Sequence, residues 1–154
     1  TRLDFPDGSF DVIWSEGAIF IIGFSSGLKA WKRLLVDGGH LVVSEYCWMR
    51  DNPPAKLVEA HTEGCTDVGD VQDRRRAVAA NGYRLLGDFV LPARGWWEQF
   101  YEPMGEGVER FRDRYRGVEP ALEVAARMQR EIELYREYSD YFGYVFFVMQ
   151  RDDG

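Results

Sequence analysis

The sequence predicts an α/β fold built around a largely parallel sheet. Two short apolar runs containing β-branched residues, 10–14 and 41–43, flank a stretch, 24–35, whose apolar residues recur at helical spacing. A strand, a helix and a strand in this order form one βαβ unit. A further run near the end of the chain, 144–149, has the strongest β propensity of all. We therefore expect a small sheet packed against helices.

The composition predicts a folded domain and argues against several kinds of partner. The 154 residues suffice for one domain with a substantial core, and 45% apolar and 15% aromatic residues are too many for a disordered chain. A net charge of −7 argues against nucleic acid or an anionic membrane surface as partner. Cys47 and Cys65 lack the spacing of a redox or zinc motif, and His40 and His61 have no ligand-spaced neighbours. We expect a cytoplasmic protein with free thiols, no metal site and no membrane span.

The first half of the chain supplies the βαβ unit. The strand 10–14 follows a turn signal and should be buried, as strands of parallel sheets are. Ser25 or Ser26 could cap the helix over 24–35, whose apolar stripe includes Leu28 and Leu35. Asp37-Gly38-Gly39 should end it, because glycine just past a helix tolerates positive φ. The run 41–43 is then a second buried strand.

The middle of the chain predicts a loop, a helix and a strand. Residues 47–65 contain Pro53-Pro54 and should be largely irregular, with one helical turn near 55–60. A helix is expected over 67–80, with the three arginines 74–76 mostly facing solvent. The strand 83–91 should carry a bulge near Gly87.

The last third predicts helices and a final strand. Residues 93–117 are rich in aromatics and glycine and should form two short helices. Pro120 suits the start of a longer amphipathic helix, which Gly143 should break before the strand 144–149.

Two segments resemble a known family. The runs FPDGSFDVIWSEG (residues 5–17) and LLVDGGHLVVSE (residues 34–45) are similar to the back half of class I, Rossmann-like S-adenosylmethionine-dependent methyltransferases. The resemblance implies a partial methyltransferase sheet of four strands, in the spatial order 10–14, 40–46, 144–150, 83–91. The last strand in sequence would be antiparallel. Residues 93–143 would be a helical insertion before that strand, acting as a substrate lid or as an interface.

The resemblance also implies that much of the cofactor site is missing from residues 1–154. The family's glycine-rich loop after the first strand, and its ribose-binding carboxylate, have no counterpart here. We expect a single truncated domain, begun at an internal start site, that binds S-adenosylmethionine weakly or not at all and is inactive alone. There are two alternatives to this expectation. The chain could be a non-catalytic dimerisation or ligand-binding module, or a second chain could supply the other half of the methyltransferase. The strand 10–14 would lie at a sheet edge, and we expect a homodimer through this edge or the bare sheet face.

The resemblance places the site at the carboxyl ends of the strands, where ligands of open sheets bind. Ser15, Glu16 and Gly17 would face the methionine end of the cofactor. The wall or lid for a small-molecule substrate would comprise Glu45, Trp96, Trp97 and Tyr101. No catalytic base is expected from sequence, since methyl transfer mainly needs alignment. The residues alone leave other interpretations open: a turn with a helix cap for 15–17, and a core or interface role for the tryptophan pair.

Overall fold

The computed structural model describes residues 3–62 and 68–152 and divides the chain into two compact units. The sheet unit comprises the chain up to Val90 and from Tyr141 onward, and the helical unit comprises Leu91–Asp140. Cys65 lies outside the described residues. Cys47 is buried and forms no disulfide. Within the part of the chain that the structure describes, every helix is too short or too polar to cross a membrane.

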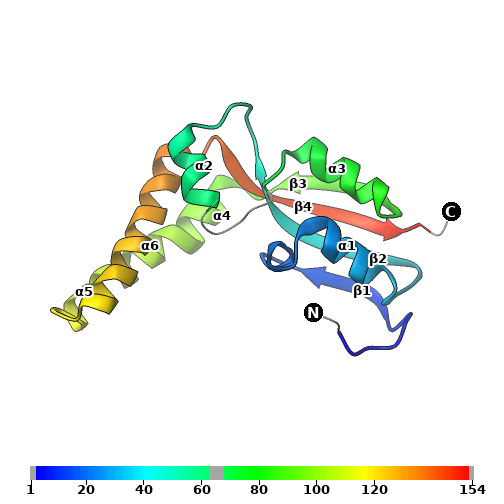
Figure 1. The fold of residues 1–154 in the computed structure, drawn as a ribbon, viewed down its shortest axis with the longest axis horizontal. Helices are drawn as coiled ribbons and strands as arrows, with labels where there is room; N and C mark the ends of the chain where they lie inside the picture. Colours follow the sequence, from blue (N-terminus) through cyan, green and yellow to red (C-terminus); the bar gives the residue numbers. More distant parts are fainter. Residues whose placement is uncertain (1–2, 63–67, 153–154) are drawn as a thin grey trace. The chain divides into compact units, whose positions relative to one another are not determined.

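The sheet has four strands in the order β1-β2-β4-β3 (Figure 1). β1 pairs in parallel with β2, and β4 runs antiparallel to both of its neighbours, β2 and β3. Both the order and the antiparallel last strand agree with the sequence prediction. The strands span Phe10–Ser15 (β1), Leu35–Trp48 (β2), Tyr83–Val90 (β3) and Phe142–Arg151 (β4).

Two helices, α1 (Phe24–Lys32) and α3 (Val71–Ala80), contact each other and cover one face of this sheet (Figure 1). A 3₁₀ turn, Ile19–Ile21, precedes α1, and the short helix α2 (Ala55–Thr62) follows the expected irregular segment. Alternate residues of β2 and β4 pack against the covering helices because successive strand side chains point to opposite faces. The buried core of the unit includes Phe24, Leu28, Leu41, Val43, Val78, Val145, Phe147 and Met149.

The expectation that 10–14 is a buried strand is wrong. β1 is the sheet edge, with β2 as its partner among the described strands. Val12 and Trp14 point away from the face that α1 and α3 cover, and they are 54% and 62% exposed. Ile13 between them packs on the core, as does Phe10 at the start of the strand.

The glycines before β2 have a different role from the predicted one. α1 ends at Lys32, and Asp37, Gly38 and Gly39 lie inside β2. The register there shifts from Phe10↔Leu35 to Val12↔His40, so the extra residues of β2 form a bulge, in which Gly38 has φ +71°. The turn that a positive φ permits is therefore within the strand and not at the end of the helix.

The predicted serine cap is also absent from α1. The helix begins at Phe24, so both serines lie inside its first turn and neither is the N-cap residue. Gly23, with φ +86°, is the N-cap residue, and no side-chain hydrogen bond caps the helix. α3 in contrast starts with a capping box: Asp73 N donates to the Asp70 carboxylate, and Asp70 N donates to that of Asp73.

Arg74 corrects the expectation of a solvated arginine face on α3. Its side chain is 5% exposed and lies against the sheet, whereas Arg76 is 70% exposed. Arg75 makes a two-pronged hydrogen bond to Asp88 of β3, at 2.8 Å for each contact. β3 carries the predicted irregularity, a register shift between Leu85 and Gly87.

The helical unit contains α4 (Ala93–Trp96), a π-helical turn (Trp97–Tyr101), α5 (Glu102–Arg114) and α6 (Glu119–Tyr138). The two short helices expected within 93–117 are thus one nearly continuous helical run. Pro103 does not interrupt it because the residue lies in the first turn of α5, where a missing N–H is tolerated. α6 contains Pro120 in its first turn, as expected, but it ends at Tyr138, and Gly143 belongs to β4.

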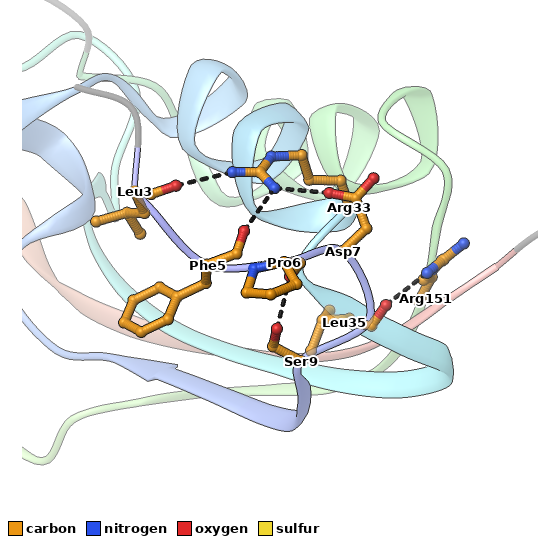
Figure 2. Close-up of polar contacts among 8 residues, drawn as sticks. All are labelled: Leu3, Phe5, Pro6, Asp7, Ser9, Arg33, Leu35 and Arg151. Carbon is orange, nitrogen blue, oxygen red and sulfur yellow. Dashed lines mark hydrogen bonds and ion pairs between the residues drawn. The ribbon is translucent and has the colours of Figure 1, made fainter.

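Arg33, just after α1, fixes the segment that precedes β1. Figure 2 shows its guanidinium donating to the carbonyl oxygens of Leu3 and Phe5, at 2.9 and 3.0 Å, and to the Asp7 carboxylate at 2.6 Å. Ser9 closes the turn by donating to the Pro6 carbonyl. The same view shows Arg151 of β4 donating to the carbonyl of Leu35, which ties the start of β2 to its neighbour.

Candidate functional site

The carboxyl ends of β1 and β2 lie side by side because the two strands are parallel and Ser15 pairs with Val43. The loop that follows β1 is held to β2 by one hydrogen bond, in which Gly17 N donates to Ser44 Oγ at 2.8 Å. Ser44 is 1% exposed and points to the face opposite α1 and α3, since Val43 on its other side belongs to the core. The structure therefore brings the predicted loop 15–17 and the end of β2 together.

A tyrosine of β4 lies next to Gly17 in this loop. Its φ is +58°, and a Cβ placed on it would lie 3.9 Å from Cε1 and 4.0 Å from Oη of Tyr144. Glu16 beside it is exposed, and Trp14 Nε1 donates to its Oε2 at 3.4 Å. The site thus presents a carboxylate, a tightly held backbone turn and an aromatic ring.

An aromatic cluster extends the site along β2. Tyr46 pairs with Tyr144 across β2 and β4, with ring centroids 6.1 Å apart at 88°. The Tyr46 ring also lies 5.7 Å from that of Trp48 and stacks on Phe142 at 5.0 Å. These residues all belong to the sheet unit.

His61 of α2 completes the cluster. Its Nε2 lies 2.6 Å from Tyr46 Oη, and its ring is 4.6 Å from the tyrosine ring. Burial lowers the pKa of His61 below its ordinary value of 6.5, so the imidazole is neutral at neutral pH. Sequence reasoning placed His61 in a loop without a partner. No spacing signal could have found the pair, because its members are 15 positions apart and belong to different elements.

Glu45 lies on the helix-covered face. Its side chain is 2% exposed, and its Oε1 is 3.7 Å from the Arg74 guanidinium, whose carbon lies 5.0 Å from the ring centre of Phe24. Burial next to this pair raises the pKa of the Cys47 thiol to about 12. Glu45 as a substrate contact stays a prediction, one that this burial does not favour.

The other predicted wall residues belong to the helical unit, where they are in mutual contact. Trp96 stacks with Tyr101 at 5.8 Å, and Tyr101 stacks with Tyr135 of α6 at 4.4 Å. Arg136 lies over the Trp97 ring at 5.0 Å. Tyr101 is 4% exposed. These contacts fix the aromatic side chains on α4, the π-helical turn and α6, and their substrate role stays a prediction.

Solved structures with this arrangement of strands and helices include S-adenosylmethionine-dependent methyltransferases. A SAM-dependent methyltransferase from Geobacter sulfurreducens, in complex with S-adenosyl-L-homocysteine, matches 93% of this chain with a TM-score of 0.77 and 20% identity. A putative sarcosine dimethylglycine methyltransferase from Galdieria sulphuraria matches 99%, also with a TM-score of 0.77, at 16% identity. The chain has the fold of a class I methyltransferase.

The chain spans only part of the length of the proteins that it matches. It spans 58% of the Geobacter protein and 57% of the Galdieria protein. Phosphoethanolamine N-methyltransferase 1 from Arabidopsis thaliana is 34% identical over 73 residues, which is 47% of this chain and 15% of that protein. The [4+2]-cyclase SpnF matches 99% of the chain with a TM-score of 0.70, so the methyltransferase fold also serves another chemistry. No protein-family profile matches the sequence.

The residues fit one end of S-adenosylmethionine. The exposed Glu16 carboxylate suits a cationic group, and the rim of the Tyr144 ring, with Cε1 and Oη, lies next to Gly17. The described residues lack a glycine-rich turn between a strand and the helix after it, because Gly38 and Gly39 form the bulge inside β2. The fit is therefore to the methionine end and not to the nucleoside.

Proposed function

We propose that this chain forms the methyl-acceptor side, and the methionine end of the cofactor site, of an S-adenosylmethionine-dependent methyltransferase for a small molecule. The observation that carries the proposal is the hydrogen bond from Gly17 N to Ser44 Oγ, at the carboxyl ends of two parallel strands in a methyltransferase-type sheet. Ligands of open α/β sheets bind at this edge, where loops converge.

In this proposal the residues of the loop 15–17 hold the methionine end of the cofactor. When bound, S-adenosylmethionine supplies an electrophilic methyl group on a sulfonium. Ser15 and Glu16 contact the charged methionine end, and Gly17 supplies the positive φ of the turn, next to Tyr144. The protein's main task is to align the acceptor and exclude water.

In this proposal, as in the sequence prediction, Trp96, Trp97 and Tyr101 serve as wall or lid for the acceptor. Several relatives are named for amine acceptors, among them phosphoethanolamine and sarcosine. Small amines are therefore the first acceptors to test.

Calorimetric titration with S-adenosylhomocysteine tests the proposal without turnover. We expect weak binding, because the chain offers contacts for the methionine end and no glycine-rich loop for the nucleoside. Gly17→Ala should weaken it further, since any side chain there is strained by the positive φ of +58°. Gly8→Ala is the matched control: its φ is +64° and a Cβ there would meet nothing within 4 Å. Equal heats for Gly17→Ala and wild type, or no binding at millimolar ligand, would contradict a cofactor role for this loop.

A specific observation favours a second function, that of a non-catalytic dimerisation module. An open groove of about 320 Å³ lies along the free edge of β1, beside the segment that Arg33 fixes. Eight of its nine lining residues are apolar: Leu3, Phe5, Phe10, Val12, Ile13, Trp14, Trp31 and Leu34, with Ser15 as the ninth. An edge strand with unpaired backbone groups and exposed apolar side chains favours pairing with another chain.

We propose a homodimer through this edge, with β1 of two copies side by side. Sedimentation at micromolar concentration should give a dimer, and Trp14→Lys should give a monomer, since it places a charge in the interface. Lys29→Ala, at a position of α1 that does not line the groove, should leave the dimer intact. A single monomeric species for the wild-type chain would contradict this second function and leave the first untouched.

A further inference from the structure

We propose that Gly27 of α1 is a positioning residue for the loop 15–17, because it forms a notch that receives the side chain of Ile19. This inference rests on the proposed function, to whose site it adds a residue of the helix behind the loop. A Cβ placed on Gly27 would lie 2.6 Å from Cγ1 and 2.8 Å from Cδ1 of Ile19. Carbon atoms in contact are normally about 3.5–4.0 Å apart, so a larger residue fits only if the isoleucine moves. Glycine inside a helix is otherwise unfavourable, and the close approach of Ile19 accounts for it here.

Ile19 has little room to move away from a larger neighbour. Its side chain is fully buried in the core of the sheet unit, together with Phe24 and Leu28 of α1. The nearest atom is Cγ1, which is bonded directly to Cβ, and a branched Cβ restricts rotation of the side chain. Close-packed cores also leave little space for rearrangement. Gly27→Ala should therefore displace the 3₁₀ turn Ile19–Ile21 by about 1 Å.

A displacement of this turn reaches the loop 15–17 because the connection is short. One residue separates Gly17 from Ile19, and two residues of chain span at most about 7 Å. On its other side, the loop is held to β2 by the hydrogen bond from Gly17 N to Ser44 Oγ, at 2.8 Å. The loop is thus fixed from two directions, by Ser44 on the sheet and by the notch on α1.

Hydrogen exchange of the Gly17 amide measures the loop without ligand or turnover. A chain with ¹⁵N-labelled glycine shows this amide, which is hydrogen-bonded to β2, and that of Gly82, which is hydrogen-bonded to a carbonyl of α3. We expect Gly27→Ala to accelerate exchange at Gly17 about tenfold, the size expected for loss of one hydrogen bond, and to leave Gly82 unchanged. Gly107→Ala, in α5, is the matched control and should change neither amide, because its added Cβ would meet nothing within 4 Å.

A second substitution separates positioning from a general loss of stability. Ile19→Ala removes the two atoms that the added Cβ would meet, so it should compensate for Gly27→Ala. Each single variant should accelerate exchange at Gly17, and the double variant should bring the rate back toward that of the wild type. Val78→Ala truncates another side chain of the same core, and it should lower stability in urea without accelerating Gly17 relative to Gly82. If Gly27→Ala does not fold, the double variant compared with Ile19→Ala still tests the notch.

Two results would overturn the positioning role. These are unchanged exchange at Gly17 in Gly27→Ala, and a double variant whose Gly17 exchanges as fast as that of Ile19→Ala alone. Titration of the same variants with S-adenosylhomocysteine separates this inference from the proposed function. If the wild type binds and Gly27→Ala binds equally well despite faster exchange at Gly17, the positioning role fails and the proposed function stands. If the wild type does not bind at millimolar ligand while the notch controls exchange at Gly17, the notch stands and the proposed function fails.

Discussion

Burial makes the ion pair between Glu45 and Arg74 sensitive to the loss of either partner. Both side chains are at most 5% exposed, so removing the cation leaves a carboxylate in a low-dielectric core. Arg74→Met should lower the free energy of unfolding by about 3–5 kcal/mol, the range for broken buried pairs. Adding Glu45→Gln should recover part of that loss, because no charge then remains buried. Urea denaturation of the single and double variants measures both effects.

Arg76→Met is the control for this experiment, because Arg76 is 70% exposed on the same helix and pairs with an exposed aspartate. Its effect should be small, as surface ion pairs contribute little. If Arg74→Met and Arg76→Met were equally stable, the buried pair would not join α3 to the sheet.

The lowered pKa of His61 predicts a pH-dependent stability. Below its ordinary pKa of 6.5, the unfolded chain takes up a proton that the folded chain does not yet bind. The free energy of unfolding should therefore fall as the pH drops from about 7.5 to 5.5, above the range in which carboxylates titrate. His61→Gln should flatten this part of the profile. An identical slope in the variant would show that the histidine is not the group responsible.

At the scale of the elements, we expect the loss of a polar side chain near the helix N-terminus to destabilise α3 but not α1. Asp70 accepts the N–H of Asp73 in the capping box, so Asp70→Ala should cost about 1 kcal/mol of stability. Ser25→Ala and Ser26→Ala should cost little, since neither side chain caps α1. Thermal unfolding of the three variants decides the matter, and a loss for Ser25→Ala as large as that for Asp70→Ala would argue for a serine cap.

The order of the strands could be predicted because apolar runs mark the strands and because two segments resemble the class I methyltransferases, whose strand order is known. Local signals failed where another part of the chain decides the outcome. The Asp37-Gly38-Gly39 turn is equally suited to a helix end and to a bulge, and pairing with β1 selects the bulge. Arg74 looks like its two neighbours in sequence, but the buried Glu45 on β2 draws it inward.

The candidate site was predictable in part for the same reason. The loop 15–17 follows directly from the end of a predicted strand, so its position at the sheet edge could be read from sequence. The pair of Tyr46 and His61 depends on how α2 packs near the end of β2, and no periodicity encodes that contact.

At the scale of the whole molecule, the helical unit interrupts a hairpin. β3 and β4 are antiparallel neighbours, and Val90 at the end of β3 pairs with Val145. The helical unit has its own buried residues, which include Val108, Ala125 and Ile132. Replacing residues 92–140 with a short glycine-rich turn should therefore leave the sheet unit folded. Circular dichroism and a single cooperative urea transition would support this prediction, whereas loss of the transition would show that the sheet unit requires the insertion.

Cys47 provides a chemical reporter of how often this sheet opens. The thiol is fully buried, and its pKa of about 12 leaves almost no reactive thiolate at neutral pH. In a Cys65→Ser background, labelling by iodoacetamide should thus proceed only through molecules that have transiently unfolded. The labelling rate should rise in step with the destabilisation of Arg74→Met, because a less stable fold has a larger unfolded fraction. Rapid labelling of the native chain would instead reveal a local opening beneath α3, without loss of the whole fold.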